Sequence, residues 1–330
     1  SFLAGIALAS GVATSQAATL KMAYDADPVS MDPHEQLSGG TLQLSHMIFD
    51  PLVRWNKAFD FEPRLAEKWE RIDDLTIRFH LRKGVKFHSG NPMTSADVVW
   101  TFDRLRESPD FKAVFSPFKE AKAVDEYTVD LVTNEPFPLV LNNATYLFPM
   151  DSKFYTGTDE NGNPKNAVVK HGNSFASRNI SGTGPYKVTY REQGVKVEFT
   201  RDSGYWDKQS KGNVDKIVLT PIKEAPTRVA ALLSNDVDFI APVPPTDLKR
   251  IEKSSNANLV TMSGTRIITL QMNQERRKEF KDPKVRQAIV HAINQEGIAK
   301  KIMKGFATPA AQFSPKGYLG HNPALTPRYD

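Results

Sequence analysis

Apolar and polar residues alternate in several short stretches of the chain, which is the pattern of a half-buried β-strand. The clearest case is TIRFHLR, where Ile77, Phe79 and Leu81 fall on one face and polar residues on the other. Further strands are expected at residues 20–24, 127–133, 186–201 and 265–274, and from residue 237 onward. These patterns predict sheets with one buried apolar face.

Other stretches repeat apolar residues at helical spacing. In TSADVVWTFDRLRE, Thr94 and Asp97 form a capping-box pattern, after which Val98, Phe102 and Leu105 share one face. Shorter helices are expected near residues 42–49 and 227–233. Strands mixed with helices along one chain predict an α/β fold.

A second well-marked helix is expected after residue 282. Asp282 is suited to cap it, and Pro283 occupies the first helical position. The predicted buried stripe of this helix consists of Val285, Ala288, Ile289 and Ala292. The two well-marked helices, after Thr94 and after Asp282, therefore each have their own start signal.

The segment ISGTGPYKV places Gly182, Gly184 and Pro185 directly before a predicted strand. A phosphate-binding loop needs successive backbone N–H groups at the start of a helix. Pro185 lacks one of these donors, and the residues that follow alternate as a strand. We therefore predict that Gly182, Gly184 and Pro185 form a structural turn, in which glycine supplies a positive φ angle.

The composition suits a globular protein of two or more domains, because 40% of the 330 residues are hydrophobic and 25% are charged. Residues 2–13 are apolar, and Ser15 and Ala17 then match the small-x-small pattern that precedes signal cleavage. We predict that residues 1–17 are a signal-peptide remnant and that the mature chain, from Ala18, is exported to the periplasm. The absence of cysteine argues against disulfides and a lipid-anchored N-terminus.

The formal net charge is +5, and the excess of Lys and Arg is concentrated in residues 265–306. The aromatic residues there, Phe280 and Phe306, do not form a series suited to base stacking, so we expect a solvated surface and no nucleic-acid partner. No run of apolar residues is long enough to span a membrane. Residues 157–179 are rich in Gly, Asn and Ser and are predicted to form a surface insertion.

Motifs of common enzymes are absent from the sequence. It contains no cysteine nucleophile, no G-x-S-x-G elbow, no H-E-x-x-H pair and no lysine-bearing phosphate loop. The seven histidines are not spaced as metal ligands, and paired carboxylates such as Asp25 and Asp27 lie in predicted turns. We therefore expect no enzymatic activity, no catalytic residue, no metal and no cofactor.

Seven segments together carry a family resemblance. They are FDPLVRW, RLAEKWE, HLRKGVKFHSGNPMTSADVVWTFDR, GTGPYKV, GYWDK, TRVAALLSNDVDF and DPKVRQAIVHAINQEGIAKKIMKG. In this order they resemble the extracytoplasmic solute-binding proteins of family 5, which are the dipeptide, oligopeptide, nickel-chelate and glutathione receptors of ABC importers.

The resemblance implies a bilobal type II periplasmic-binding-protein-like fold with a small α+β domain inserted in the first lobe. Residues 18–49 and 180–264 would form the first lobe (domain I), residues 50–179 the inserted domain II, and residues 265–330 the start of the second lobe (domain III). Family members continue well beyond this point, so the chain is expected to be C-terminally incomplete. The acid and the arginine that grip a peptide in relatives would lie after Asp330.

Members of the family hold an extended peptide between their lobes, largely by backbone hydrogen bonds. By position, the resemblance implies a first-lobe wall made of Ser38, Gly39, Gly40 and Thr41, where small residues let a ligand backbone approach. A simple helix-entry loop is the alternative for these four residues. Further ligand contacts are implied for Met150, Asp151, Arg266 and Ile267.

The function implied is that of a monomeric substrate-binding subunit that captures di- or oligopeptides and delivers them to a membrane permease. The same fold could instead carry a nickel chelate, glutathione or a sugar derivative. A periplasmic hydrolase and a basic nucleic-acid-binding module are the alternatives from other classes, and each lacks the sequence motif that it requires.

Overall fold

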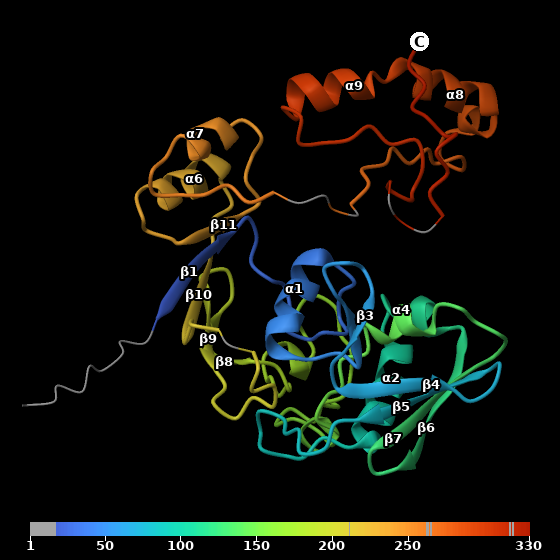
Figure 1. The fold of residues 1–330 in the computed structure, drawn as a ribbon, viewed down its shortest axis with the longest axis vertical. Helices are drawn as coiled ribbons and strands as arrows, with labels where there is room; N and C mark the ends of the chain where they lie inside the picture. The colour runs from blue at the N-terminus through green and yellow to red at the C-terminus, as the bar shows by residue number, and fades with distance from the viewer. Residues whose placement is uncertain (1–17, 211, 262–263, 265, 317, 319) are drawn as a thin grey trace, which may run out of the picture. The chain divides into compact units, whose positions relative to one another are not determined.

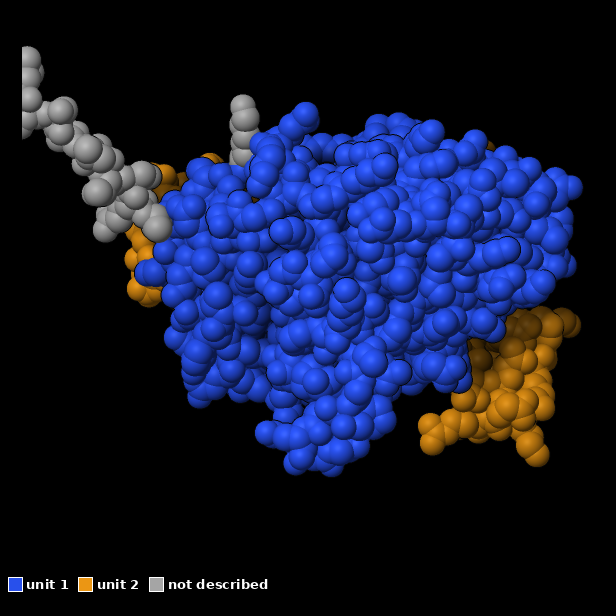
Figure 2. Space-filling model, turned by 90° about the horizontal axis from the view of Figure 1, so that it is seen from below, with its two compact units in different colours: residues 1–223 blue, residues 224–330 orange. Residues whose placement is uncertain are grey.

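The computed structural model describes residues 18–330 except residues 211, 262–263, 265, 317 and 319. The signal peptide predicted at residues 1–17 lies outside the described residues. The chain divides into unit 1, which ends at Lys223, and unit 2, which runs from Glu224 to Asp330. The two units are coloured blue and orange in Figure 2. Among the described residues, no helix is both long and apolar enough to cross a bilayer.

One sheet of unit 1 contains the strands expected from alternation near residues 20 and 190. They lie in the order β1 (Thr19–Tyr24), β10 (Lys216–Pro221), β9 (Lys196–Arg201) and β8 (Tyr186–Glu192). β1 and β10 run parallel, and the other neighbours run antiparallel. The strand predicted at residues 186–201 is two antiparallel strands, β8 and β9, joined by a turn in which Val195 is exposed.

A second sheet of unit 1 is antiparallel throughout. Its order is β4 (Ala66–Arg71), β5 (Thr76–Leu81), β7 (Thr128–Thr133) and β6 (Phe118–Asp125), visible in Figure 1. A short hairpin of β2 (Val53–Trp55) and β3 (Phe61–Pro63) accompanies it. The strands predicted at residues 76–82 and 127–133 are confirmed, and the central position of both strands in the sheet explains why their apolar residues are buried.

Helix α2 (Ser95–Glu107) packs against β6 and β7 and closes the core of this second sheet. Its start is as predicted, because the backbone N–H of Thr94 donates to Asp97 Oδ2 at 2.8 Å. Phe102 is fully buried among aromatic side chains, with its ring 5.9 Å from that of Phe115 and 6.0 Å from that of Phe118. Two short helices, α3 (Lys112–Phe115) and α4 (Val140–Ala144), complete this part of the fold.

Unit 1 contains two separate apolar clusters. One consists of residues between Leu52 and Leu147 and lies under the second sheet. The other combines residues 22–49, 148–176 and 197–219 around α1 (Gly39–Ile48) and the first sheet. Helix α5 (Ser152–Tyr155) and the short helix η1 (Phe175–Ser177) also belong to this cluster. The lobe boundaries implied by the family resemblance remain a prediction.

Most of the regular elements of unit 2 are helices, and the segments between them are irregular. Its elements are α6 (Ala225–Leu233), β11 (Phe239–Ala241), α7 (Leu248–Glu252), η2 (Lys278–Lys281), α8 (Pro283–Ala292), α9 (Gln295–Gly297) and η3 (Ile298–Ile302). The helices predicted at residues 227–233 and after Asp282 are confirmed as α6 and α8. The α/β fold class expected from the mixture of strands and helices is likewise confirmed.

Two predictions for unit 2 are wrong. Residues 266–274 form no strand, and Ile268 and Leu270 are 80% and 64% exposed. The predicted stripe of α8 is also not buried, because Val285 and Ile289 are only half-buried and Ala288 and Ala292 are exposed. A strand needs a hydrogen-bonded neighbouring strand, and the described residues of unit 2 provide none for residues 266–274. The apolar face of a helix needs other residues packed against it, and the described residues of unit 2 do not bury that face of α8.

Candidate functional site

The candidate site is built around loop 36–41, the segment from Gln36 to Thr41 at the start of α1. Ser38 Oγ donates to Thr41 Oγ1 at 3.0 Å, and Thr41 Oγ1 donates to Gln36 Oε1 at 3.2 Å. These bonds close the loop on itself and bury Thr41, whereas Ser38, Gly39 and Gly40 are exposed. A Cβ atom added at either glycine would meet no heavy atom within 4 Å, so the space over them is open.

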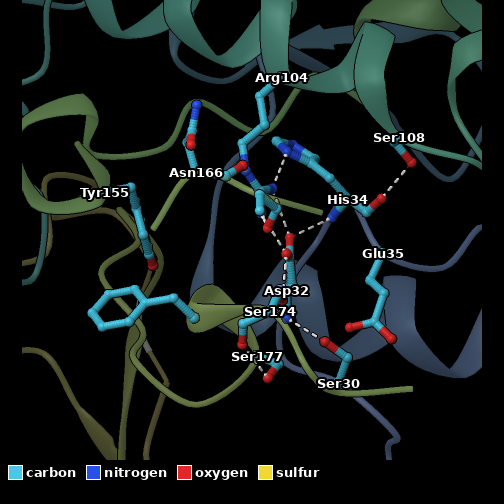
Figure 3. Close-up of polar contacts among 12 residues, drawn as sticks. Ser30, Asp32, His34, Glu35, Arg104, Ser108, Tyr155, Asn166, Ser174 and Ser177 are labelled. Atoms are coloured by element: carbon cyan, nitrogen blue, oxygen red, sulfur yellow. Dashed lines mark hydrogen bonds and ion pairs between the residues drawn. The ribbon is translucent and has the colours of Figure 1, made fainter. Parts of the chain in front are cut away.

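The segment that leads into this loop is fastened by a buried ion pair. The Arg104 guanidinium meets the Asp32 carboxylate in a two-point contact, with Nη2–Oδ2 at 2.5 Å and Nη1–Oδ1 at 2.9 Å (Figure 3). The side chains are only 2% and 0% exposed. Ser174 Oγ donates to Asp32 Oδ2 at 2.9 Å, so the carboxylate is satisfied from two elements. We call Asp32, His34, Arg104 and Ser174 the Arg104 cluster.

His34 is a neutral member of the Arg104 cluster. Its Nδ1 lies 3.0 Å from Arg104 Nη1, and because a guanidinium only donates, Nδ1 accepts and the ring proton sits on Nε2. Burial, reinforced by the Arg104 charge and opposed by Asp32, lowers the pKa of His34 to about 3. Burial alone would raise the pKa of Asp32, but the charge and hydrogen bonds of Arg104 outweigh it and lower the pKa to about 2.

The remaining donors of Arg104 reach residues 166–177. Nε donates to the carbonyl oxygen of Asn166 at 2.8 Å, and Nη2 to that of Ala167 at 3.2 Å. The backbone N–H of Gly172 donates to Glu35 Oε1 at 2.8 Å. Residues 157–179 were predicted to be a surface insertion, and this is wrong for 172, 174, 176 and 177, which are buried beside the Arg104 cluster. Their Gly and Ser residues serve close packing and hydrogen bonding.

The Arg104 cluster was missed by the sequence analysis. One signal for it exists in α2, because Asp97, Thr101 and Arg104 recur at helical spacing on the edge of the buried stripe, and all three are buried. A charged residue at such a position needs a buried partner. The partner is Asp32, which lies 72 residues away in the sequence. Only the tertiary fold determines that these two residues meet.

Residues 183–185 form a bend directly before β8, but the positive φ angle predicted for the glycines of this turn is wrong. Neither Gly182 nor Gly184 has a positive φ. Both instead pass against the end of α1, where Gly184 N–H donates to the Ile48 carbonyl oxygen at 2.8 Å. An added Cβ would lie 2.1 Å from that oxygen at Gly182 and 2.4 Å from the Ile48 carbonyl carbon at Gly184. Close backbone approach therefore requires glycine here.

Met150 and Asp151, for which ligand contacts were implied, are fully buried. The backbone N–H of Met150 donates to Thr101 Oγ1 at 2.8 Å. The Asp151 carboxylate accepts from Ser181 Oγ at 3.1 Å and from Asn91 Nδ2 at 3.0 Å. Both residues therefore have partners inside unit 1 and offer no side-chain surface to a ligand in this structure. Their ligand-binding role stays a prediction.

Arg266 and Ile267, the other two residues with implied ligand contacts, belong to unit 2. Arg266 is exposed and Ile267 is half-buried, and they lie in an irregular segment. The structure therefore places Ser38, Gly39, Gly40 and Thr41 in one loop of unit 1, whereas Arg266 and Ile267 belong to unit 2. A ligand contact for this pair also stays a prediction.

A polar hollow of about 310 Å³ lies elsewhere in unit 1. Its lining consists of His46, Arg54, Arg64, Pro185, Tyr205, Asp207, Gln209 and Ser210. Arg64 bonds Asp50 at 2.7 Å and Asp207 at 3.2 Å, so its charge is compensated from two sides. Among the described residues, no group of three or more His, Cys, Asp or Glu side chains is arranged to hold a metal ion.

The chain is similar to several known proteins. The dipeptide-binding protein of Escherichia coli K12 is 29% identical over 335 residues, covering 94% of this chain and 60% of that protein. The glutathione-binding protein GsiB of Pectobacterium atrosepticum is 29% identical over 288 residues, covering 85% and 53%. The structure of the periplasmic binding protein DppA from Helicobacter pylori in complex with the peptide STSA superposes with a TM-score of 0.80 at 27% identity, covering 94% of this chain and 64% of DppA.

The chain thus spans 53–60% of the length of these two curated relatives. The family model for the middle region of bacterial extracellular solute-binding proteins, family 5, matches residues 60–330. That match includes α2 and the turn at residues 182–185, and it extends to the last residue of unit 2. The chain therefore belongs to the bacterial extracellular solute-binding proteins of family 5.

Proposed function

We propose that the chain is part of a periplasmic substrate-binding subunit of an ABC importer, which captures di- or oligopeptides and delivers them to the membrane permease. The observation that carries this proposal is the similarity, over 94% of the chain, to a binding protein solved with a bound peptide. The E. coli dipeptide-binding relative supports the same class of cargo. In this proposal the protein binds its ligand without chemical conversion, as its relatives' names indicate.

Loop 36–41 is suited to contact a peptide backbone. The first N–H groups of a helix have no acceptor within the helix, so those of Gly39, Gly40 and Thr41 are donors for ligand carbonyl oxygens. The open space above the two glycines admits a main chain without steric conflict. Peptides are commonly recognised in this way, through main-chain hydrogen bonds with side chains left to provide specificity.

Glutathione is the second candidate cargo, because the GsiB relative covers 85% of the chain at the same identity as the dipeptide-binding relative. Glutathione carries peptide-like amide groups, so the same donors in loop 36–41 would serve it. Its additional carboxylate would require further cationic contacts. Binding of peptides and binding of glutathione must therefore be compared directly on the same protein sample.

The test is a thermal melt of the 330-residue chain with pooled dipeptides, pooled tripeptides, glutathione or nickel–histidine. A ligand at a hundred times its Kd stabilises the folded state by about 2.7 kcal/mol, which raises Tm by several degrees. We expect a rise with the peptide pools. A rise with glutathione or nickel–histidine alone would replace the peptide cargo, and no rise with any of them would contradict ligand capture by this chain.

A pair of matched variants assigns the effect to the loop. Gly40 and Ala96 are both exposed second residues of their helices, α1 and α2. Gly40→Val puts a branched side chain where the peptide backbone would lie and should abolish the peptide-induced rise. Ala96→Val makes a similar change on the other helix and should leave that rise unchanged. An unaltered rise in Gly40→Val would remove loop 36–41 from the site.

A further inference from the structure

The end of α2 and the residues that follow it run alongside the segment that enters loop 36–41. Three side chains at and after the end of α2 contact three residues of the segment that enters loop 36–41. Both sets follow the order of the sequence. The contacts are the Arg104–Asp32 ion pair at 2.5 Å, Ser108 Oγ to the His34 carbonyl oxygen at 2.6 Å, and the Leu37 N–H to Asp110 Oδ2 at 3.1 Å. The segment is therefore fastened progressively up to the residue before Ser38.

The first two contacts are buried, and the third is not. Arg104 and Ser108 lie in the interior, where their loss would disturb packing. The Asp110 side chain is 31% exposed, and its other oxygen, Oδ1, pairs with Lys170 Nζ. Asp110 therefore contributes little to the core, although it holds the backbone at the edge of the loop.

We propose that Asp110 is a positioning residue for ligand capture, which holds the Leu37 backbone so that the N–H groups of loop 36–41 point toward the ligand. This inference rests on the proposed function of the loop. Asp110 itself touches no ligand and acts through the single hydrogen bond to Leu37. The hydrogen bond with Lys170, against the effect of burial, lowers the pKa of Asp110, so Oδ2 belongs to an ionised carboxylate where it accepts from Leu37 N–H.

The physical reason is preorganisation. Leu37 is exposed, so its own side chain does little to anchor the loop entrance. Without the Asp110 contact, the backbone at Leu37, Ser38 and Gly39 samples other conformations, and the two successive glycines that follow Ser38 make this sampling easy. If the competent conformation falls to about one tenth of the population, the apparent Kd rises about tenfold. Folding stability changes little, because the lost contact is at the surface.

Three variants separate the Leu37 contact from the Lys170 ion pair. Asp110→Ala removes both contacts. Asp110→Asn keeps a side-chain oxygen that accepts from Leu37 N–H and removes the charge that pairs with Lys170. Lys170→Met removes the ion pair and leaves the Leu37 contact. Apparent Kd is obtained by fitting the rise of Tm with the concentration of the pooled dipeptides, for each variant and for the unaltered chain.

We expect Asp110→Ala to weaken binding about tenfold. We expect Asp110→Asn and Lys170→Met to stay within about twofold of the unaltered chain, because both retain the Leu37 contact. Equal losses in all three variants would assign the effect to the ion pair and would overturn the proposal. Unchanged binding in Asp110→Ala would overturn it as well.

Hydrogen exchange of the ligand-free chain gives a readout that does not depend on the cargo. Amides of residues 37–42 should exchange about tenfold faster in Asp110→Ala than in Asp110→Asn, with the core of α2 unaffected. Equal exchange in the two variants would overturn the positioning role whatever the chain binds. If the unaltered chain responds to no ligand while the exchange difference is present, the proposed function fails, and the role of Asp110 in ligand capture fails with it.

Discussion

Helices α2 and α8 each begin with a capping hydrogen bond to an aspartate, but the two helices differ in what they bury. In α2, Asp97 accepts from the Thr94 N–H at 2.8 Å, and in α8, Asp282 Oδ1 accepts from the Lys284 N–H, also at 2.8 Å. Seven residues of α2 are buried, whereas every described residue of α8 is half-buried or exposed. A helix start is thus a local property, whereas burial of the helix face depends on the rest of the fold.

Two alternating segments show the same difference between the units. TIRFHL became β5, paired on both sides, with Phe79 fully buried. RIITL has a comparable pattern but forms no strand and leaves Ile268 and Leu270 exposed. Alternation shows that a segment is suited to a half-buried strand, and the strand forms only where neighbours supply hydrogen bonds.

The largest effect is expected from truncating the buried face of α2. Phe102→Ala should cost about 4 kcal/mol of unfolding free energy, because it removes a ring from a closely packed aromatic cluster. Ile289→Ala on the half-buried face of α8 should cost less than about 1 kcal/mol. All four tryptophans, at positions 55, 69, 100 and 206, lie in unit 1, so their fluorescence during urea unfolding reports on Phe102→Ala.

Hydrogen exchange of α8 amides reports on Ile289→Ala in unit 2. If this variant loosened α8 as much as Phe102→Ala destabilises unit 1, the contrast between the two helices would be wrong. In solution, the apolar face of α8 would then be buried against other residues of the protein. The sequence-based prediction of a buried stripe in α8 would then be correct.

The second prediction compares a buried ion pair with an exposed one. Arg104→Met should cost about 3 kcal/mol, since it leaves Asp32 charged in the interior of unit 1. Lys300→Met breaks a 3.0 Å pair with Glu296 whose side chains are mostly exposed, and it should change stability by less than the error of measurement.

The double variant Arg104→Met with Asp32→Asn makes this comparison sharper. It should recover part of the loss, because an uncharged amide costs less to bury than an unpaired carboxylate. Urea unfolding followed by tryptophan fluorescence measures all of the unit 1 variants. No recovery in the double variant would show that packing of the Arg104 stem, and not the stranded charge, determines the cost.

The third prediction concerns acid sensitivity of unit 1. Below pH 6.5 the unfolded chain binds a proton at His34, whereas the folded chain resists protonation until the pH approaches its folded pKa of about 3. The contribution of neutral His34 to the free energy of unfolding is therefore fully present above pH 6.5. Below that pH it falls by about 1.4 kcal/mol per pH unit, and the loss reaches about 2 kcal/mol at pH 5. His34→Asn, which cannot titrate, should have a flatter profile by this amount in urea titrations at several pH values.

The sign of this prediction follows from burial of a neutral imidazole. The Asp32 pKa, lowered to about 2, adds a further loss only when the pH falls below the unfolded value of about 3.8. Burial also lowers the pKa of His46 and of His88, so these groups add to the acid sensitivity of unit 1 in both proteins. The difference in slope between His34→Asn and the unaltered chain from pH 6.5 to pH 4 therefore reports on His34. Equal slopes for His34→Asn and the unaltered chain in that window would show that other groups cause the acid sensitivity.

The smallest effect is expected at the helix starts. Thr94→Ala and Asp282→Ala should each cost about 1 kcal/mol of local helix stability, because each removes a side-chain contribution to helix capping. The two losses should be similar despite the different burial of α2 and α8. They are measured as faster exchange of amides in the first turns. A loss in α2 alone would show that capping at α8 depends on tertiary contacts.

The turn at residues 182–185 illustrates how far local patterns reach. Its position before a strand was correct from sequence. The reason for Gly182 and Gly184 was not, because it depends on the end of α1 about 135 residues earlier in the chain. Glycine is compatible with both a positive φ angle and a close backbone contact, so its presence alone cannot distinguish them.

The candidate site shows the same limit. Ser38, Gly39, Gly40 and Thr41 were predicted from their position in the family and their small size, and the structure exposes the first three and buries Thr41. Met150 and Asp151 were predicted from position in the family alone, and both are buried with internal partners. Position along a family template indicates the neighbourhood of a residue but does not show which way its side chain points.

The sequence by itself determined the α/β class, most of the strands and helices, the helix caps and the family, since each depends on short-range pattern or on several segments in a set order. The tertiary structure alone decided the pairing of Asp32 with Arg104, the hold of Asp110 on Leu37 and the exposure of α8. The physical reason is that burial and ion pairing are properties of two surfaces in contact, and the residues of each surface lie far apart in the chain.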